Sequence, residues 1–220
     1  MMPFTLSKDP YNLIITGVGG QGNVLASRII GEMLLQTGCI VTIGETFGAS
    51  QRGGSVMSHV RISKKSYFSP QIPRGMADFI VALEPTEAIR VLRDYGNPSV
   101  LVISNTRPIH PIGVISGEQS YPSIEDMKTW IGQLSMQAWF IDATEKAMGL
   151  GNPMLGNIIA VGALSRTGVL PMDKKTFINV LSKNISAERL DQNIAAYDIG
   201  QGMIKSNILY NQKPKEKSLA

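Results

Sequence analysis

The apolar and polar positions along the chain alternate between strand-like and helix-like patterns. Continuous apolar runs at 12–16, 78–83 and 100–103 are typical of strands that are buried on both faces of a sheet. Leu25, Ile29 and Met33 instead recur at every fourth position, which indicates one apolar face of a helix. The patterns predict strands at 12–16, 39–43, 55–62, 78–83, 100–103 and 138–141, and helices at 22–37, 85–94, 124–135, 144–150, 154–167, 174–183 and 187–205.

This alternation predicts an α/β protein with a Rossmann-like, three-layer α/β/α fold and a mostly parallel sheet. The strand at 55–62 has one apolar face and one more polar face, and the polar face carries His59 and Arg61. We therefore expect that this face is covered only partly, or is covered by a partner.

Length and composition change this picture little. The 220 residues suit one domain, which we place at 11–206, between a loose lead-in at 1–10 and a charged, disordered tail at 207–220. The net charge of +4 is not arranged as a basic stripe with interleaved aromatic residues, so nucleic acid binding is not indicated. We find no apolar run that could span a membrane and no signal peptide, so we expect a soluble cytoplasmic protein without membrane contact.

Metal and nucleophilic chemistry have few candidate residues. Cys39 is the single cysteine, so no cysteine cluster can hold zinc or iron–sulfur, and we expect it to be a small buried apolar residue. His59 and His110 lack a metal-ligand spacing, so no metal site is predicted. His59 is either catalytic or, as we favour, a hydrogen-bonded structural residue. No nucleophile is paired with a base, so the catalytic residues stay unassigned.

A first glycine loop follows the strand at 12–16 and opens the next helix. It contains Gly17, Gly19, Gly20, Gln21 and Gly22, and its glycines match G-x-G-x-x-G. In a dinucleotide site, such a loop brings a pyrophosphate close to a helix N-terminus, and Glu45 lies at about the spacing of a ribose-binding acid. The alternative is a tight strand-to-helix turn that binds no ligand.

A second glycine loop, at 44–54, runs directly into the strand at 55–62. Its glycines flank one acidic and one basic residue, and Arg52 could clamp a phosphate or carboxylate or pair with Glu45. The loop residues that we single out are Glu45, Gly48, Ser50, Gln51, Arg52, Gly53 and Gly54.

Together the two loops resemble a known family. The first loop, followed by Ser50-Gln51-Arg52-Gly53-Gly54 and by Ser58-His59-Val60-Arg61, is similar to the gamma domain of 2-oxoacid:ferredoxin oxidoreductases. The form of the second motif is most similar to the beta subunits of indolepyruvate ferredoxin oxidoreductases. Further matches in the family's order, which extend to about residue 202, include Glu84, Asn105, Asn152 and Asn157.

This resemblance implies a small subunit that binds no cofactor by itself and is inactive alone. The complete enzyme would decarboxylate an arylpyruvate oxidatively, form an acyl-coenzyme A and reduce ferredoxin. Thiamine diphosphate and iron–sulfur clusters would lie on a larger alpha subunit. The second loop, with His59 and Arg61, would form a subunit contact or a wall of the active site.

Three alternatives remain open at this point. Phe47 and Ala49 replace the His and Met that are common in the family, so pyruvate, 2-oxoglutarate or another 2-oxoacid could be the substrate. The first glycine loop also fits a stand-alone oxidoreductase that binds NAD(P) or FAD. A nucleotide-sensing or scaffolding module is the alternative that is not an enzyme.

Overall fold

The computed structural model describes residues 4–47, 54–183 and 185–204. Within them, strands form one six-stranded sheet in the order β2-β3-β1-β4-β5-β6. β3 is antiparallel to β1 and β2, whereas β1, β4, β5 and β6 pair in parallel. The strands are β1 (Tyr11–Val18), β2 (Ile40–Phe47), β3 (Ser55–Ser63), β4 (Phe79–Ala82), β5 (Leu101–Asn105) and β6 (Gln137–Ile141).

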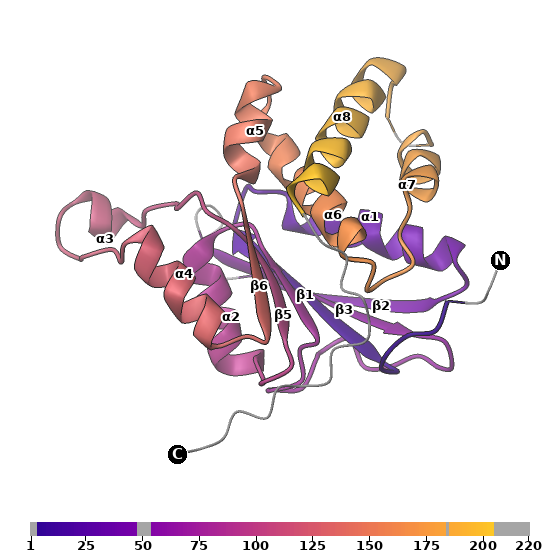
Figure 1. Cartoon of the computed structure of the whole chain (residues 1–220), viewed down its shortest axis with the longest axis horizontal. Helices are drawn as coiled ribbons and strands as arrows, with labels where there is room; N and C mark the ends of the chain where they lie inside the picture. The colour runs from indigo at the N-terminus through magenta and orange to yellow at the C-terminus, as the bar shows by residue number, and fades with distance from the viewer. Residues whose placement is uncertain (1–3, 48–53, 184, 205–220) are drawn as a thin grey trace.

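Helices cover both faces of this sheet, so the molecule has three layers (Figure 1). One layer holds α1 (Asn23–Gln36), α5 (Ala143–Gly149), η1 (Pro153–Leu155), α6 (Gly156–Thr167), α7 (Lys174–Leu181) and α8 (Ala187–Met203). The other layer holds α2 (Pro85–Tyr95), α3 (Ile112–Ile115) and α4 (Ile124–Gln133). The predicted three-layer fold with a mostly parallel sheet is confirmed.

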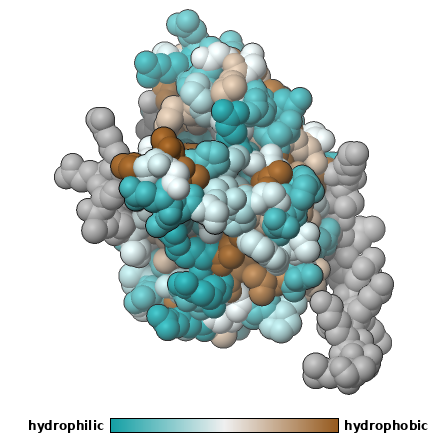
Figure 2. Space-filling model, turned by 90° about the vertical axis from the view of Figure 1, so that its left-hand side faces the viewer, coloured by the Kyte–Doolittle hydropathy of each residue, from teal (hydrophilic) through white to brown (hydrophobic). Residues whose placement is uncertain are grey.

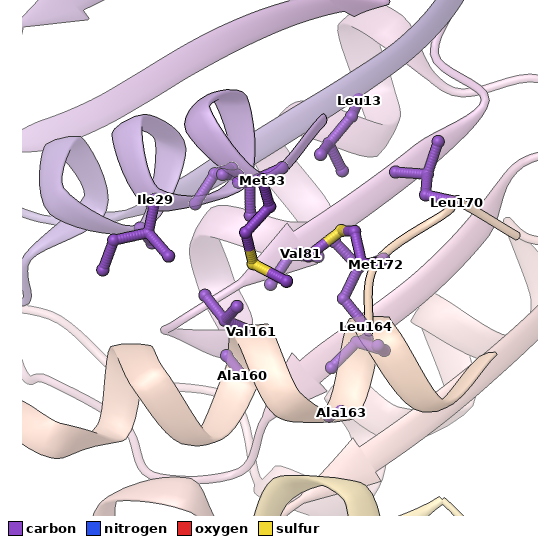
Figure 3. Packing of buried hydrophobic residues seen from close by; sticks show 14 of the residues in the cluster. Leu13, Ile29, Met33, Val81, Ala160, Val161, Ala163, Leu164, Leu170 and Met172 are labelled. Carbon is purple, nitrogen blue, oxygen red and sulfur yellow. The ribbon is translucent and has the colours of Figure 1, made fainter. Parts of the chain in front are cut away.

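Alternate residues of each strand serve two separate cores, because successive side chains of a strand point to opposite faces. Leu13 and Ile15 of β1 belong to the larger core, and Ile14 between them belongs to the smaller core under α2 and α4. Figure 3 shows the larger core, where Met33 of α1 lies opposite Val161 of α6. This two-sided burial explains why β1 and β4 read as continuous apolar runs.

The helices α6 and α8 pack closely because glycines lie at their contact. A Cβ atom at Gly162 would lie 2.1 Å from the Tyr197 carbonyl oxygen, and one at Gly200 would lie 1.9 Å from the Ile159 carbonyl oxygen. Neither distance leaves room for a methyl group, so both positions require glycine.

Two elements differ from their predictions. β2 continues through Gly44 and Glu45 to Phe47, so the first residues of the predicted second glycine loop are strand. They are strand because they pair residue by residue with β3, which turns back directly after the loop. The short helix α3 lies in a stretch where the prolines and glycines predict no helix.

The more polar face of β3 is covered by residues 68–72 of the same chain, which we call the strap. Arg61 donates from Nη1 to the Ser69 carbonyl at 3.1 Å, and its guanidinium lies 4.9 Å from the centre of the Phe68 ring. His59 is buried, and its Nδ1 accepts the Ile72 N–H at 3.3 Å. The expectation that this face is covered only partly is therefore wrong at His59, which is buried, but it is confirmed at Arg61, which the strap leaves half-buried.

The domain bounds at 11 and 206 stay predictions, and part of the predicted lead-in already packs on the domain. Leu6 is buried, and Lys8 forms a 2.6 Å ion pair with Asp78, so contacts with the domain begin before residue 10. The predicted tail at 207–220 lies outside the described residues. Among the described helices, none is long and apolar enough to cross a bilayer.

Candidate functional site

The candidate site lies at the edge of the sheet where the parallel strands end. The helix after β1 covers one face of the sheet and the helix after β4 covers the other, although β1 and β4 are neighbours. Open α/β sheets bind their ligands at such a switch point, because the two loops diverge there. The first glycine loop, the end of the second, Glu84 and Asn105 lie at this edge.

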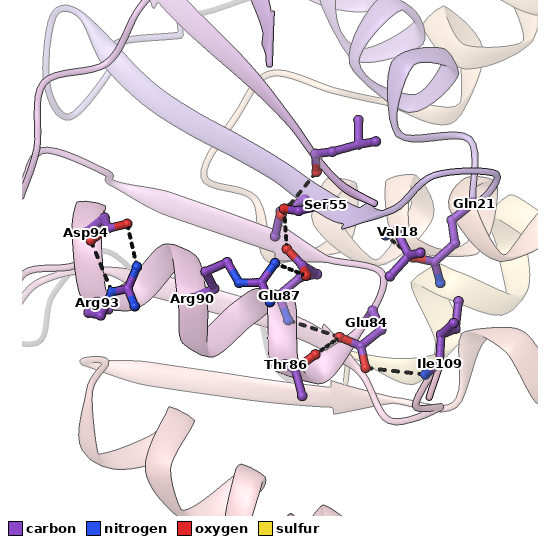
Figure 4. Close-up of polar contacts among 12 residues, drawn as sticks. Val18, Gln21, Ser55, Glu84, Thr86, Glu87, Arg90, Arg93, Asp94 and Ile109 are labelled. Atoms are coloured by element: carbon purple, nitrogen blue, oxygen red, sulfur yellow. Dashed lines mark hydrogen bonds and ion pairs between the residues drawn. The ribbon is translucent and has the colours of Figure 1, made fainter. Parts of the chain in front are cut away.

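The first glycine loop is closed by its own glutamine. Gln21 Oε1 accepts the Val18 N–H at 2.7 Å, and Gln21 Nε2 donates to the Leu83 carbonyl at 2.9 Å (Figure 4). The side chain thus bridges the ends of β1 and β4 across the switch point. A Cβ atom at Gly17 would lie 2.6 Å from Gln21 Oε1, so this glycine makes room for the glutamine.

The helix end of the loop is closed by asparagines. Gly22 caps α1 with φ of 82°, in the left-handed region that favours glycine. Asn157 Nδ2 donates to the Gly22 carbonyl at 3.2 Å, and a Cβ atom at Gly22 would lie 2.1 Å from that nitrogen. Asn23 donates to the Val18 carbonyl at 3.4 Å, so α1, α6 and β1 are joined here. The glycines at 17 and 22 are thus explained by packing against side chains of this chain.

The two glycine loops meet at this edge. The Gly19 N–H donates to the Gly54 carbonyl at 2.8 Å, and Val18 pairs with Ser55 at the start of β3. Gly48, Ser50, Gln51, Arg52 and Gly53 lie outside the described residues, and so does the predicted pairing of Arg52 with Glu45.

Glu84 is a buried carboxylate at the end of β4 and caps helix α2. Its Oε2 accepts the Glu87 N–H at 3.0 Å and the Thr86 hydroxyl at 2.5 Å. Its Oε1 accepts the Tyr121 hydroxyl at 2.5 Å and the Ile109 N–H at 3.3 Å. Glu84 therefore ties the segment before and after α3 to the sheet edge.

Burial is the main cause that raises the pKa of the Tyr121 phenol, and the Glu84 carboxylate adds to the shift. The family resemblance and the helix start at Pro85 both point to Glu84, but its partner Tyr121 was missed, because nothing in the local pattern links residues so far apart.

The two other asparagines in the predicted set have structural contacts. Asn105 at the end of β5 donates to the Leu83 carbonyl at 3.1 Å and to the Thr144 hydroxyl at 2.8 Å, so it joins β4 to the start of α5. Asn152 accepts the Met154 N–H at 3.0 Å and caps η1. Asn105 therefore lies at the site edge beside the Gln21 bridge, and Asn152 supports the turn before α6.

Glu45 is in the wrong strand for a ribose-binding acid. In a dinucleotide fold, that acid ends the strand next to the glycine-loop strand. Here β3 lies between β2 and β1, so Glu45 is two strand spacings from β1, roughly 9–10 Å. The spacing along the sequence suggested that Glu45 lies beside the first glycine loop, but the strand order places β3 between them.

His59 and Arg61 lie apart from the glycine loops. Ser55 pairs with Val18 at the loop edge, whereas Arg61 pairs with Asn12 near the opposite edge of the sheet. Burial lowers the pKa of the His59 imidazole, so it stays neutral and can accept the strap N–H. The structure thus brings Gly19, Gly54 and Ser55 together and separates them from His59 and Arg61.

The comparison with protein-family models now decides the family. The model for pyruvate ferredoxin/flavodoxin oxidoreductase matches residues 12–202, which is most of the chain. The chain belongs to this family. Its two glycine loops, Glu84, Asn105 and Asn157 all lie inside the matched region.

Relatives in this oxidoreductase family match over nearly their full length. The indolepyruvate oxidoreductase subunit IorB of Thermococcus kodakarensis and that of Pyrococcus horikoshii are each 36% identical over 191 residues. In both cases the match covers 86% of this chain and 94% of the relative. The pyruvate oxidoreductase subunit PORC of Thermotoga maritima has the same fold, with a TM-score of 0.67 at 20% identity over 89% of this chain and 97% of that chain.

The cysteine content of this chain does not fit an iron–sulfur cluster. An iron–sulfur cluster needs several thiolates, and Cys39 is the single cysteine and is buried. Within the described residues, no group of three or more His, Cys, Asp or Glu side chains could hold a metal ion.

Proposed function

We propose that this chain is the small, non-cofactor subunit of a 2-oxoacid:ferredoxin oxidoreductase that acts on an arylpyruvate such as indolepyruvate. The complete enzyme releases carbon dioxide from the 2-oxoacid, transfers the acyl group to coenzyme A and passes the electrons to ferredoxin. The observation that carries this proposal is the match to two proteins that are named indolepyruvate oxidoreductase subunits. Each is 36% identical to this chain, and the match covers 94% of its length.

Under this proposal, a larger alpha subunit carries thiamine diphosphate and the iron–sulfur clusters. The single buried cysteine of this chain supports that division, because it offers at most one thiolate. The isolated chain is then expected to be inactive with every 2-oxoacid.

We place the contact with the larger subunit at the switch-point edge. Support comes from the Gly19–Gly54 hydrogen bond, which brings the ends of both glycine loops to one surface. In this arrangement the second loop contacts the larger subunit or forms part of the wall of its coenzyme A or thiamine diphosphate pocket. His59 is outside this proposal, because the strap buries it, and so is Arg61, because it pairs with Asn12 far from the loop edge.

The alternative substrate remains another 2-oxoacid, pyruvate first. It is favoured by Phe47 and Ala49, which depart from the family's common residues at the start of the second loop. A stand-alone dinucleotide enzyme has less support, because Gln21 bridges the switch point and β3 separates Glu45 from β1.

The decisive experiment is gentle purification of the chain from its own cells without oxygen, followed by native mass spectrometry and assays. We expect a complex with a larger subunit that reduces ferredoxin when it receives coenzyme A and indolepyruvate. Pyruvate and 2-oxoglutarate, each assayed in the same preparation, decide the substrate class.

Other results would redirect the assignment. A complex that prefers pyruvate would keep the enzyme class and change the substrate. A chain that purifies without a larger subunit and shows saturable calorimetric binding of NAD(H), NADP(H) or FAD would overturn the proposal.

A further inference from the structure

Glu87 is a buried carboxylate on α2 whose side chain contacts a residue outside its own helix. Glu84 and Glu87 stand at the cap and the third position of α2, where a capping box would turn the second side chain back to the cap. Instead, Glu87 Oε2 accepts the Ser55 hydroxyl at 2.5 Å, across the sheet edge. The contact joins α2 to the first residue of β3.

Ser55 is also the point at which the two glycine loops are fixed to each other. On one side, Gly54 accepts the Gly19 N–H and Ser55 pairs with Val18. On the other side, Glu87 holds the Ser55 side chain (Figure 4). The end of the second glycine loop is thus clamped between β1 and α2.

Burying the charged form of Glu87 costs free energy, and a residue with a role only in folding would not require that charge. Its side chain is 5% exposed, and Arg90, which donates to Oε1 at 2.7 Å, is the partly exposed counter-charge. Burial raises the pKa of Glu87 most strongly and the Glu84 charge adds to it, whereas Ser55 and Arg90 oppose the rise. An ion pair with a partly exposed arginine contributes little to stability, whereas the Ser55 contact fixes the end of the second glycine loop, so we assign Glu87 a role in positioning.

We infer that Glu87 is a positioning residue that holds Ser55 and Gly54 in the geometry needed to bind the larger subunit. This inference rests on the proposed function, because it assumes that the switch-point edge contacts that subunit. Glu87 acts through Ser55 and does not itself need to touch the partner or its cofactors.

The test is the binding of the full-length chain to the purified larger subunit, with four test variants and one control variant. Glu87→Ala and Ser55→Ala each remove the contact, and the double variant removes both partners. Glu87→Gln keeps an oxygen that can accept the Ser55 hydroxyl. Asp94→Asn is the matched control, since it removes an exposed carboxylate at the far end of the same helix.

We expect Glu87→Ala and Ser55→Ala each to raise the Kd by about tenfold, the change expected for loss of one charge-assisted hydrogen bond. The double variant should be no weaker than either single variant, because both changes remove the same contact. Glu87→Gln should lie within about threefold of wild type, and Asp94→Asn should match wild type. A general loss of stability would not produce this rescue and non-additivity.

The failures of the inference and of the proposed function are distinguishable. If the wild-type chain binds no larger subunit, the proposed function is wrong. If wild type binds, and Ser55→Ala or a folded Glu87→Ala binds equally well, the inference is wrong and the proposed function stands. Additive losses in the double variant would also overturn the inference. If Glu87→Ala does not fold, the comparison of Ser55→Ala with Glu87→Gln decides alone.

Discussion

A carboxylate that is shielded from water needs donors, and Glu84 has four of them. Two come from α2 itself, through Glu87 N and the Thr86 hydroxyl, and two come from Ile109 and Tyr121. The first pair is a local cap that any Glu-Pro-Thr-Glu sequence could form. The second pair makes the same side chain the anchor of the segment around α3.

The contact between Tyr121 and Glu84 can be tested by stability. Tyr121→Phe should lower the free energy of unfolding by about 1–2 kcal/mol, because it removes a donor from a buried charge and the phenol is half-buried. Tyr67→Phe is the control, since Tyr67 is 81% exposed and should change stability by less than about 0.5 kcal/mol. Urea unfolding of both variants measures the difference, and equal stabilities would show that the phenol does not anchor this segment.

His59 predicts a pH dependence of stability. Burial holds its pKa below the usual 6.5, so the unfolded chain takes up a proton at a higher pH than the folded chain does. The contribution of neutral His59 is therefore complete above pH 6.5 and is lost as the pH falls below 6.5 towards the folded pKa. In His59→Gln, the free energy of unfolding should fall less steeply below pH 6.5 than in wild type. Parallel curves from urea unfolding across this range would refute the prediction.

At the scale of elements, the sequence predicted well wherever periodicity and local chemistry decide the structure. The helix that begins at Pro85 follows from a capping glutamate and a proline at its first position. Prediction from the sequence was wrong where strand pairing determines the length of an element. β2 is longer than predicted because β3 pairs with it along its whole length. The short second loop already pointed to this hairpin, since a parallel crossover needs a longer connection.

The contact between α6 and α8 predicts a large difference between neighbouring glycines. Gly200→Ala should destabilise the fold by more than about 3 kcal/mol, because the methyl group would overlap a backbone carbonyl that cannot move freely. Gly202→Ala on the same helix should be neutral or stabilising by about 0.5–1 kcal/mol, since nothing lies within 4 Å of its Cβ position. Thermal unfolding compares them, and similar melting temperatures would contradict the packing described here.

On the scale of the whole molecule, the candidate site could be predicted only in part. The glycine loops were found from their spacing, and the structure brings Gly19 and Gly54 together. Ser55 and Glu87 were missed, because a contact between a strand start and a helix start leaves no periodic signal. Ile112 and Ile115 on α3 are exposed. On the face that Figure 2 shows, apolar residues form small separate patches among polar ones.

The sheet order predicts a gradient of protection from hydrogen exchange. β1, β3, β4 and β5 each have a hydrogen-bonded strand on both sides, whereas β2 and β6 end the sheet among the described strands. Amides of the four inner strands should exchange slowest, because they open only with the whole sheet. Exchange in β2 or β6 as slow as in β3 would show that another element, or a partner, covers that edge.

The position of β3 also has a consequence for synthesis on the ribosome. β1 and β2 emerge first, but neither can bond to the other, because the strand that lies between them follows both in the chain. A nascent chain that ends before Ser55 therefore leaves these two strands with unpaired edges, which other chains and chaperones recognise. The emergence of β3 is the step that first pairs both strands, and the second edge of β1 is covered only when β4 follows.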